Sequence, residues 1–180
     1  MKTRPITDST RVSILEAAWR LASSTRRVDF GWAELAEAAG VSRQTVYLAF
    51  GSRAGLLLDM VRHHDRHRPE LRKLIELGRN GTDPAALRAF AGSWLDYLPE
   101  VQPVALQLEF GAGTGDEALA AWENRMVQAL LAGFRAIAGR AVAAGHLPGQ
   151  NPDELATTIW GLVAPSAWAL HVDRLGWAPE

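Results

Sequence analysis

Residues 30–50 read FGWAELAEAAGVSRQTVYLAF, and this stretch decides how the first third of the chain folds. Its apolar residues recur at spacings of three and four, which predicts two short helices rather than strands. The helices meet at Ala39-Gly40-Val41-Ser42, where glycine permits a left-handed turn and serine caps the helix that follows. We therefore expect a sharp corner, from which a helix runs from Ser42 to about Phe50 and is stopped by Gly51.

The first turn after this corner carries polar side chains that no core requires. Arg43, Gln44 and Thr45 follow the cap directly. Arginine and glutamine can each pair with a base edge through two hydrogen bonds. In a helix-turn-helix, the N-terminal residues of the second helix reach the bases in the major groove. The alternative is an ordinary helical corner with a solvated end, and spacing alone does not separate the two.

A longer pattern surrounds this corner, over about residues 8–60. It comprises Arg11-x-x-Ile14-Leu15, then Glu34-Leu35-Ala36-x-x-Ala39-Gly40-Val41-Ser42-x-x-Thr45-Val46-Tyr47-x-x-Phe50, and then Ser52-Arg53-x-x-Leu56-Leu57. In order and spacing this pattern resembles the TetR family of bacterial transcriptional regulators. The resemblance implies a helix-turn-helix head on an all-α body, and a homodimer that binds a palindromic DNA operator. It also implies release of the operator by a small ligand in the body. The sequence itself gives no reason to expect a cofactor.

The resemblance assigns roles by position. Arg43, Gln44 and Thr45 would face the major groove, while Tyr47 and Arg53, which replaces the usual lysine, would contact phosphates. Phe30-Gly31 stand where the family usually has threonine, which leaves the backbone N–H of Gly31 or Trp32 to meet a phosphate. Gly55 replaces a common glutamate and so removes a capping box from Ser52. The expected DNA-binding residues are Gly31, Trp32, Ser42, Arg43, Gln44, Thr45, Tyr47 and Arg53.

Composition and charge are consistent with a soluble globular regulator. The chain has 180 residues, of which 48% are hydrophobic and 22% charged, and it has no cysteine, which excludes disulfides and thiolate metal sites. Residues 1–53 carry eight basic and five acidic side chains, a net charge of +3, against a net −4 over residues 54–180. This asymmetry favours a nucleic-acid-binding head, although an excess so small can arise by chance.

Neither a targeting signal nor a membrane span is expected. The start, MKTRPITDST, has no apolar run, so it is no signal peptide. The most apolar stretch, Ile159 to Leu170, is too short to cross a bilayer and contains Pro165. We therefore expect a cytoplasmic protein that does not engage a membrane.

Helical periodicity continues through the remaining chain, which predicts an all-α protein with a DNA-binding domain over residues 1–53 and a ligand-binding and dimerisation domain over residues 54–180. The fourth helix should begin after Ser52 and end near Arg68. Further helices are expected over residues 70–77, from the cap Asp83 to Leu98, over residues 103–110, over 116–144 as the longest, and from the cap Asn151 to about Leu175, with a bend at Pro165.

The last two helices are more apolar than one chain can cover. A helix that is hydrophobic nearly all round must be covered nearly all round, so a second subunit is the expected cover. A monomeric bundle with a generous core is the alternative. The residues expected at the dimer interface are Leu131, Phe134, Leu155, Ile159, Val163 and Ala167.

Aromatic residues concentrate in the body, where five of the seven tryptophans follow residue 90. Pockets between helices are common small-molecule sites, although such residues can equally form plain core. We expect an apolar effector to contact Phe90, Trp94, Tyr97, Phe110, Trp122, Met126 and Trp160.

Three further patterns carry less chemistry. His63 and His67 have i, i+4 spacing, but no third ligand is evident, so no metal site is expected. Gly111-Ala-Gly-Thr-Gly115 lacks the residues of a phosphate loop and is expected to be a linker. No nucleophile–base pairing stands out, so an enzyme is not expected. The alternative function is an all-α small-molecule carrier or small enzyme that happens to contain a helical corner.

Overall fold

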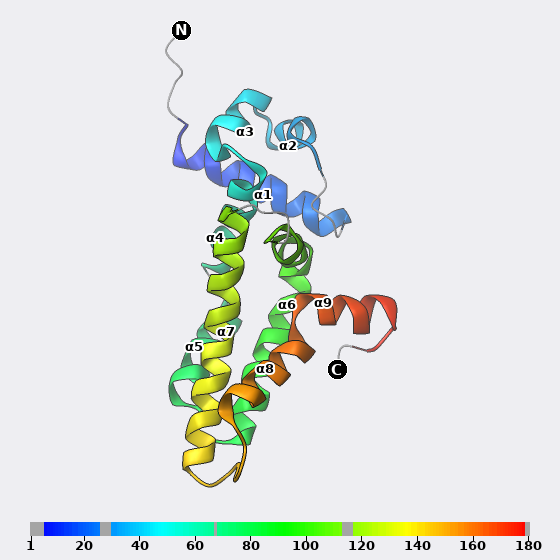
Figure 1. The fold of residues 1–180 in the computed structure, drawn as a ribbon. Coiled ribbons are helices and arrows are strands. Elements are labelled where there is room, and N and C mark those ends of the chain that lie inside the picture. Colours follow the sequence, from blue (N-terminus) through cyan, green and yellow to red (C-terminus); the bar gives the residue numbers. More distant parts are fainter. Residues whose placement is uncertain (1–5, 26–29, 67, 113–116, 179–180) are drawn as a thin grey trace. The chain divides into compact units, whose positions relative to one another are not determined.

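The computed structural model describes residues 6–25, 30–66, 68–112 and 117–178, and these residues form α-helices, one short π-helical turn and no strand (Figure 1). The helices are α1 (Asp8–Thr25), α2 (Trp32–Ala39), α3 (Arg43–Phe50), α4 (Arg53–Asp65), α5 (Pro69–Asn80), α6 (Pro84–Ala112), α7 (Glu117–Ala143), α8 (Pro152–Val163) and α9 (Pro165–Trp168), followed by the π-helical turn η1 (Ala169–Arg174). The expected all-α class is confirmed.

The chain divides into two compact units. The first, here called the head, contains residues 1–67 and 103–120, and the second, here called the body, contains residues 68–102 and 121–180. The helix α6 contributes its first part to the body and its last part to the head. The domain boundary expected after residue 53 falls inside the head and stays a prediction.

Local capping signals fix the corner in the head. Gly40 ends α2 in the left-handed conformation with φ 66°, and the N–H of Val41 donates to the carbonyl oxygen of Ala36 at 2.9 Å. The hydroxyl of Ser42 accepts the N–H of Thr45 at 3.0 Å and so caps α3. Gly51, at φ 68°, ends α3 as expected. The helical corner predicted from residues 30–50 is therefore confirmed.

An apolar core and one arginine hold the head helices together. The helix α1 packs on α2 and α4, around buried side chains such as Ile14, Leu35 and Leu56. The Arg11 guanidinium on α1 donates to the carbonyl oxygen of Ala49, pairs with the carboxylate of Asp59 and lies 4.7 Å from the centre of the Phe50 ring. Arg11 thus joins α1 to α3 and α4, which fixes the orientation of α3.

The body packs α5, α7 and α8 around the first half of α6. Its core includes Phe134 and Ile137 of α7, both fully buried. Arg140 of α7 donates from Nε to the carbonyl oxygen of Gly81 and from Nη2 to that of Gly78, each at 2.7 Å. A cation at the C-terminal end of a helix interacts favourably with its unpaired carbonyl groups, so Arg140 closes the end of α5.

Two helices run further than the sequence suggested. The helix α5 continues through Gly78 to Asn80, whereas a helix over residues 70–77 was expected. The helix α6 continues through Pro99 and Pro103 to residue 112 and has 29 residues, so it, rather than the 27-residue α7, is the longest. Buried residues on both sides of the two prolines, including Leu98 and Val104, offset the lost backbone hydrogen bonds. The expected interruption between Leu98 and residue 103 is wrong.

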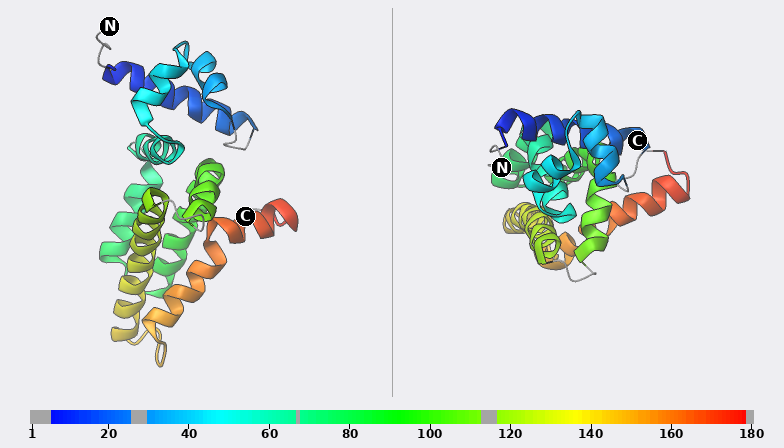
Figure 2. Two further views of the ribbon diagram at one scale, coloured as in Figure 1. Left: turned by 45° about the horizontal axis from the view of Figure 1, so that its top comes forward. Right: turned by 90° about the horizontal axis from the view of Figure 1, so that it is seen from above.

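The last predicted helix bends at Pro165, as expected. The helix α8 ends at Val163, Ala164 adopts an extended conformation with ψ 153°, and α9 begins at Pro165. The two segments meet at 45°, so α9 leaves the line of α8 (Figures 1 and 2). Asn151 caps the start of α8 by accepting the N–H groups of Asp153 and Glu154.

Candidate nucleic-acid interface and apolar cavity

One side of α3 is buried and the other is presented to solvent. Val46, Ala49 and Phe50 face the core. Arg43 and Gln44 are exposed in the first turn, whereas Thr45 is half-buried and its hydroxyl lies 2.8 Å from that of Ser42. Of the three predicted residues, Arg43 and Gln44 are therefore exposed to solvent, whereas Thr45 supports the cap.

The exposed side continues for a second turn. Tyr47 is 59% exposed and Leu48 is 50% exposed. Positions four apart share one side of a helix, so Arg43 and Gln44 continue directly into Tyr47 and Leu48. These four residues are called the reading face below. Leu48 is not among the residues expected to bind DNA, although its spacing of four from Gln44 places it on the same side of the helix.

The start of α2 is held from the side by Arg53. Its Nη1 donates to the carbonyl oxygen of Phe30 at 2.8 Å, and its guanidinium lies 5.3 Å from the centre of the Phe30 ring. Gly31 occupies the N-cap without a side-chain cap, and Trp32 is half-buried. Arg53, expected to contact a phosphate, therefore also positions the N–H groups at the start of α2.

Gly55 allows α3 and α4 to approach closely. A Cβ at this position would lie 2.4 Å from the carbonyl oxygen of Phe50, which already accepts the N–H of Ser52. The N–H of Gly55 donates to the Ser52 hydroxyl at 3.0 Å. The missing glutamate is thus explained, because a side chain does not fit in this tight turn.

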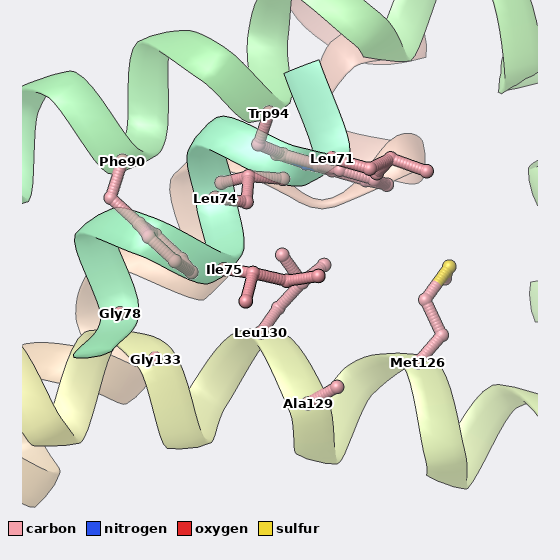
Figure 3. Close-up of a pocket in the computed structure, with 10 residues that line it drawn as sticks. All are labelled: Leu71, Leu74, Ile75, Gly78, Phe90, Trp94, Met126, Ala129, Leu130 and Gly133. Atoms are coloured by element: carbon pink, nitrogen blue, oxygen red, sulfur yellow. The ribbon is translucent and has the colours of Figure 1, made fainter. Parts of the chain in front are cut away.

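The body contains an apolar cavity of about 340 Å³ between α5, α6 and α7 (Figure 3). The residues that line it carry no charged side chain. They are Leu71, Leu74, Ile75 and Gly78 of α5, Phe90 and Trp94 of α6, and Met126, Ala129, Leu130 and Gly133 of α7. A site of this size and lining suits a small apolar molecule.

Three of the aromatic and methionine residues expected at a ligand site line this cavity, namely Phe90, Trp94 and Met126. Tyr97 and Trp160 lie behind Trp94, with ring centres 6.1 Å and 6.3 Å from it. Phe110 is 65% exposed, belongs to the head and is not among the residues that line the cavity. The side chain of Trp122 lies outside the described part of the structure.

Sequence patterns do not single out the remaining lining residues, because they are ordinary aliphatic or glycine positions on α5 and α7. Nothing in their type distinguishes them from core. The Trp94 indole has a further role, because its Nε1 donates to the carbonyl oxygen of Val163 at 2.8 Å. That bond serves a carbonyl group at the break between α8 and α9.

Comparison with known families decides the nature of the head. Residues 14–60 match the model of the bacterial regulatory proteins of the tetR family. The head is a TetR-family head. The match spans the helical corner, the reading face and the start of α4, so it agrees with the residues that carried the sequence resemblance. A search of curated protein sequences finds no match.

Solved structures share the TetR-type fold over nearly the whole chain. The transcriptional regulator FadR from Bacillus subtilis, solved in complex with stearoyl-CoA, gives a TM-score of 0.69 at 15% identity and covers 93% of this chain and 90% of its own. NalD from Pseudomonas aeruginosa, the secondary repressor of the MexAB-OprM multidrug efflux pump, gives 0.62 at 21% identity, with 96% and 89% covered. The fold of the described residues is therefore that of TetR-type regulators.

The residues expected at the dimer interface differ in how deeply they are buried within the single chain. Leu131, Phe134 and Val163 are buried within one chain, and Leu155, Ile159 and Ala167 are half-buried. The ring of Phe134 contacts that of Phe90, with centres 4.7 Å apart, so it serves the core of the body. Small or apolar residues that are exposed on these helices include Ala132 of α7 and Gly161 and Leu162 of α8.

The apolar helices of the body also meet the length and composition criteria of membrane spans. Leu119–Ala143 qualifies alone, and Pro152–Val163 with Pro165–Arg174 qualifies as a bent pair. Core helices of soluble proteins meet the same criteria, so this is weak evidence for a membrane. Within the described residues, no three His, Asp or Glu side chains group as a metal site would require, and His67 lies outside those residues.

Proposed function

We propose that this chain is a cytoplasmic, ligand-responsive repressor of transcription that binds a palindromic operator as a homodimer. The observation that carries the proposal is the reading face, in which Arg43, Gln44, Tyr47 and Leu48 stand exposed on a helix capped by Ser42. Arginine and glutamine suit guanine and adenine, and an apolar side chain suits the thymine methyl group.

Substitutions can distinguish residues that read bases from residues that contact phosphates. We expect Arg43→Ala or Gln44→Ala to change base preference by about 1–3 kcal/mol for each bidentate pair lost. Tyr47→Phe should weaken binding to all sequences alike, because phosphate contacts carry no base information. Selection of bound sequences from random DNA, followed by gel retardation, measures both effects. Glu37→Ala, an exposed change on α2, is the control. An unchanged base preference in both Arg43→Ala and Gln44→Ala would contradict the proposal.

The dimer is proposed to form through the exposed small residues of α7 and α8. A Cβ at Gly161 meets nothing within 4 Å in the single chain, and Leu162 beside it is 63% exposed. Gly161→Arg therefore leaves one chain undisturbed but places a charge where a second copy would pack. We expect monomers in sedimentation and loss of operator retardation. Gly92→Arg on α6, also with open space around its Cβ, is the matched control and should leave a dimer.

The effector is proposed to be an uncharged apolar molecule held in the body cavity. FadR was solved with stearoyl-CoA, but the cavity residues here offer no charge for the polar part of such a ligand. Binding should lower operator affinity, and a coupling of about 1–3 kcal/mol is typical of such sites. Titration of tryptophan fluorescence with apolar compounds, repeated with operator DNA present, tests this. A tight binder that leaves operator affinity unchanged would refute the switch while leaving DNA binding intact.

A further inference from the structure

One end of the cavity is closed by an aromatic ring that lies beside two glycines, one of which has no room for a side chain. A Cβ at Gly133 would lie 2.3 Å from Cζ of Phe90, and a Cβ at Gly78 would lie 3.6 Å from Cε2 of the same ring. The Phe90 ring therefore lies against the backbones of α5 and α7, at the end of the cavity where these two glycines meet (Figure 3).

The ring is also supported by a residue that does not line the cavity. Phe134, which is fully buried, meets Phe90 edge-on at 73° with centres 4.7 Å apart. Phe90 itself is only 3% exposed. A close-packed neighbourhood of this kind resists displacement, because a side chain that is pushed into it must move others. The Phe90 end of the cavity is therefore rigid.

Away from the Phe90 ring the cavity is open and adaptable. Ile75 and Ala129, one turn from the two glycines, are exposed, and Met126 beyond them is half-buried (Figure 3). Methionine has three rotatable side-chain bonds and adapts its shape to what it contacts. Met126 lies seven residues before Gly133 on α7, which corresponds to about 10 Å along the helix. The cavity is thus elongated, with an adaptable side chain, Met126, toward one end and the closely packed Phe90 ring at the other (Figure 3).

We propose that Phe90 is a specificity-determining residue that limits the length of a linear aliphatic ligand entering from the Met126 end. This inference rests on the proposed ligand-binding function of the cavity. While a chain still fits, each added methylene buries more apolar surface and tightens binding about fourfold. A methylene that reaches the Phe90 ring meets packed core instead, so affinity stops rising at a defined chain length.

The test uses the full chain and the series of 1-alkanols from pentanol to dodecanol, with dissociation constants from calorimetry. The wild-type protein should bind each longer alkanol more tightly up to a cut-off. Phe90→Ala should move the cut-off to longer chains and bind the first alkanol beyond the wild-type cut-off about tenfold more tightly. Phe90→Leu, which removes fewer atoms, should move it in the same direction and serves if Phe90→Ala does not fold.

A matched control distinguishes a specific limit on ligand length from a general loss of core packing. Leu98→Ala removes a fully buried side chain of the same helix that does not line the cavity, so its cut-off should equal that of the wild type. An unchanged cut-off in both Phe90 variants, or an equal shift in Leu98→Ala, would overturn the inference while the cavity remains a ligand site. If the wild-type protein binds no alkanol, the proposed aliphatic effector fails, and the inference fails with it.

Discussion

The interactions that hold the helices together inside the head differ from those around the cavity of the body. In the head, directional polar contacts fix the helices: Arg11 joins α1, α3 and α4, and Arg53 grips the carbonyl group before α2. Around the cavity, shape decides instead, and Phe90 fits because Gly133 has no side chain. A surface that reads bases must keep its groups in fixed positions, whereas a cavity for apolar molecules needs only complementary walls.

This difference predicts unequal tolerance to the same substitution, glycine to alanine. Gly55→Ala should have the largest effect, because the new Cβ meets the backbone oxygen of Phe50 at 2.4 Å and a backbone group cannot rotate away. We expect the free energy of unfolding of the head to fall by about 2–3 kcal/mol, the upper part of the range for overpacking. Hydrogen exchange of α3 and α4 measures it. Gly92→Ala, in open space on α6, should instead gain up to about 1 kcal/mol of helix propensity.

Gly133→Ala should cost less, because its Cβ meets the edge of a ring rather than backbone. The new Cβ displaces a closely packed side chain rather than backbone, so we expect the body to lose about 1–2 kcal/mol of unfolding free energy. Hydrogen exchange of α6 and α7 is the measurement, and exchange in α1 and α4 should stay unchanged. A larger loss than for Gly55→Ala would invert the comparison and show that the cavity wall is the stiffer of the two regions.

Arg11→Met tests how much the polar contacts of Arg11 stabilise the head. The change keeps the length of the side chain but leaves Asp59, which is 20% exposed, without its main partner. Arg11 is itself 42% exposed, so solvent screening limits the expected loss to about 1 kcal/mol. Denaturant unfolding checks it. Arg62→Met, which removes a longer and more exposed contact to the same carboxylate, should change stability by less than about 0.5 kcal/mol.

Gly31→Ser should have the smallest effect and the opposite sign. The N-cap of α2 has no side-chain cap, and a Cβ there meets nothing within 4 Å. A serine hydroxyl can accept an N–H of the first turn, which stabilises the helix by a few tenths of a kcal/mol. Thermal unfolding measures this gain. Gly31→Ala, which adds a Cβ without a hydroxyl, should not stabilise the head, and equal gains in both variants would rule out capping as the cause.

The head was predictable from sequence because its signals are local. Ser42, Gly40 and Gly51 each act on the backbone within a few residues, so their positions mark the helix ends directly. Arg53 shows the limit of this reasoning. Its contact with Phe30 joins residues 23 positions apart, and no local pattern announces it. The role of Arg53 as a support for α2 therefore became visible only in three dimensions.

The body was less predictable because packing overrides local propensity there. Pro99 and Pro103 each predict a helix end, yet buried side chains on both sides carry α6 through them. The cavity residues of α5, such as Leu71 and Leu74, are indistinguishable by type from core residues. Whether an aliphatic residue lines a cavity or fills a core depends on which neighbours are absent. Gly133, which leaves room for the Phe90 ring, contributes to that here, and helical periodicity does not reveal it.

The all-apolar lining of the cavity determines which properties of a bound molecule this protein could distinguish. A wall without charged side chains cannot recognise functional groups, so compounds that fit the cavity would be ranked by how readily they leave water. The order of their affinities should then follow their oil–water partition coefficients rather than any chemical family. Under the proposed function, the affinity of the site would depend on the lipophilicity of a molecule up to the size limit set by Phe90.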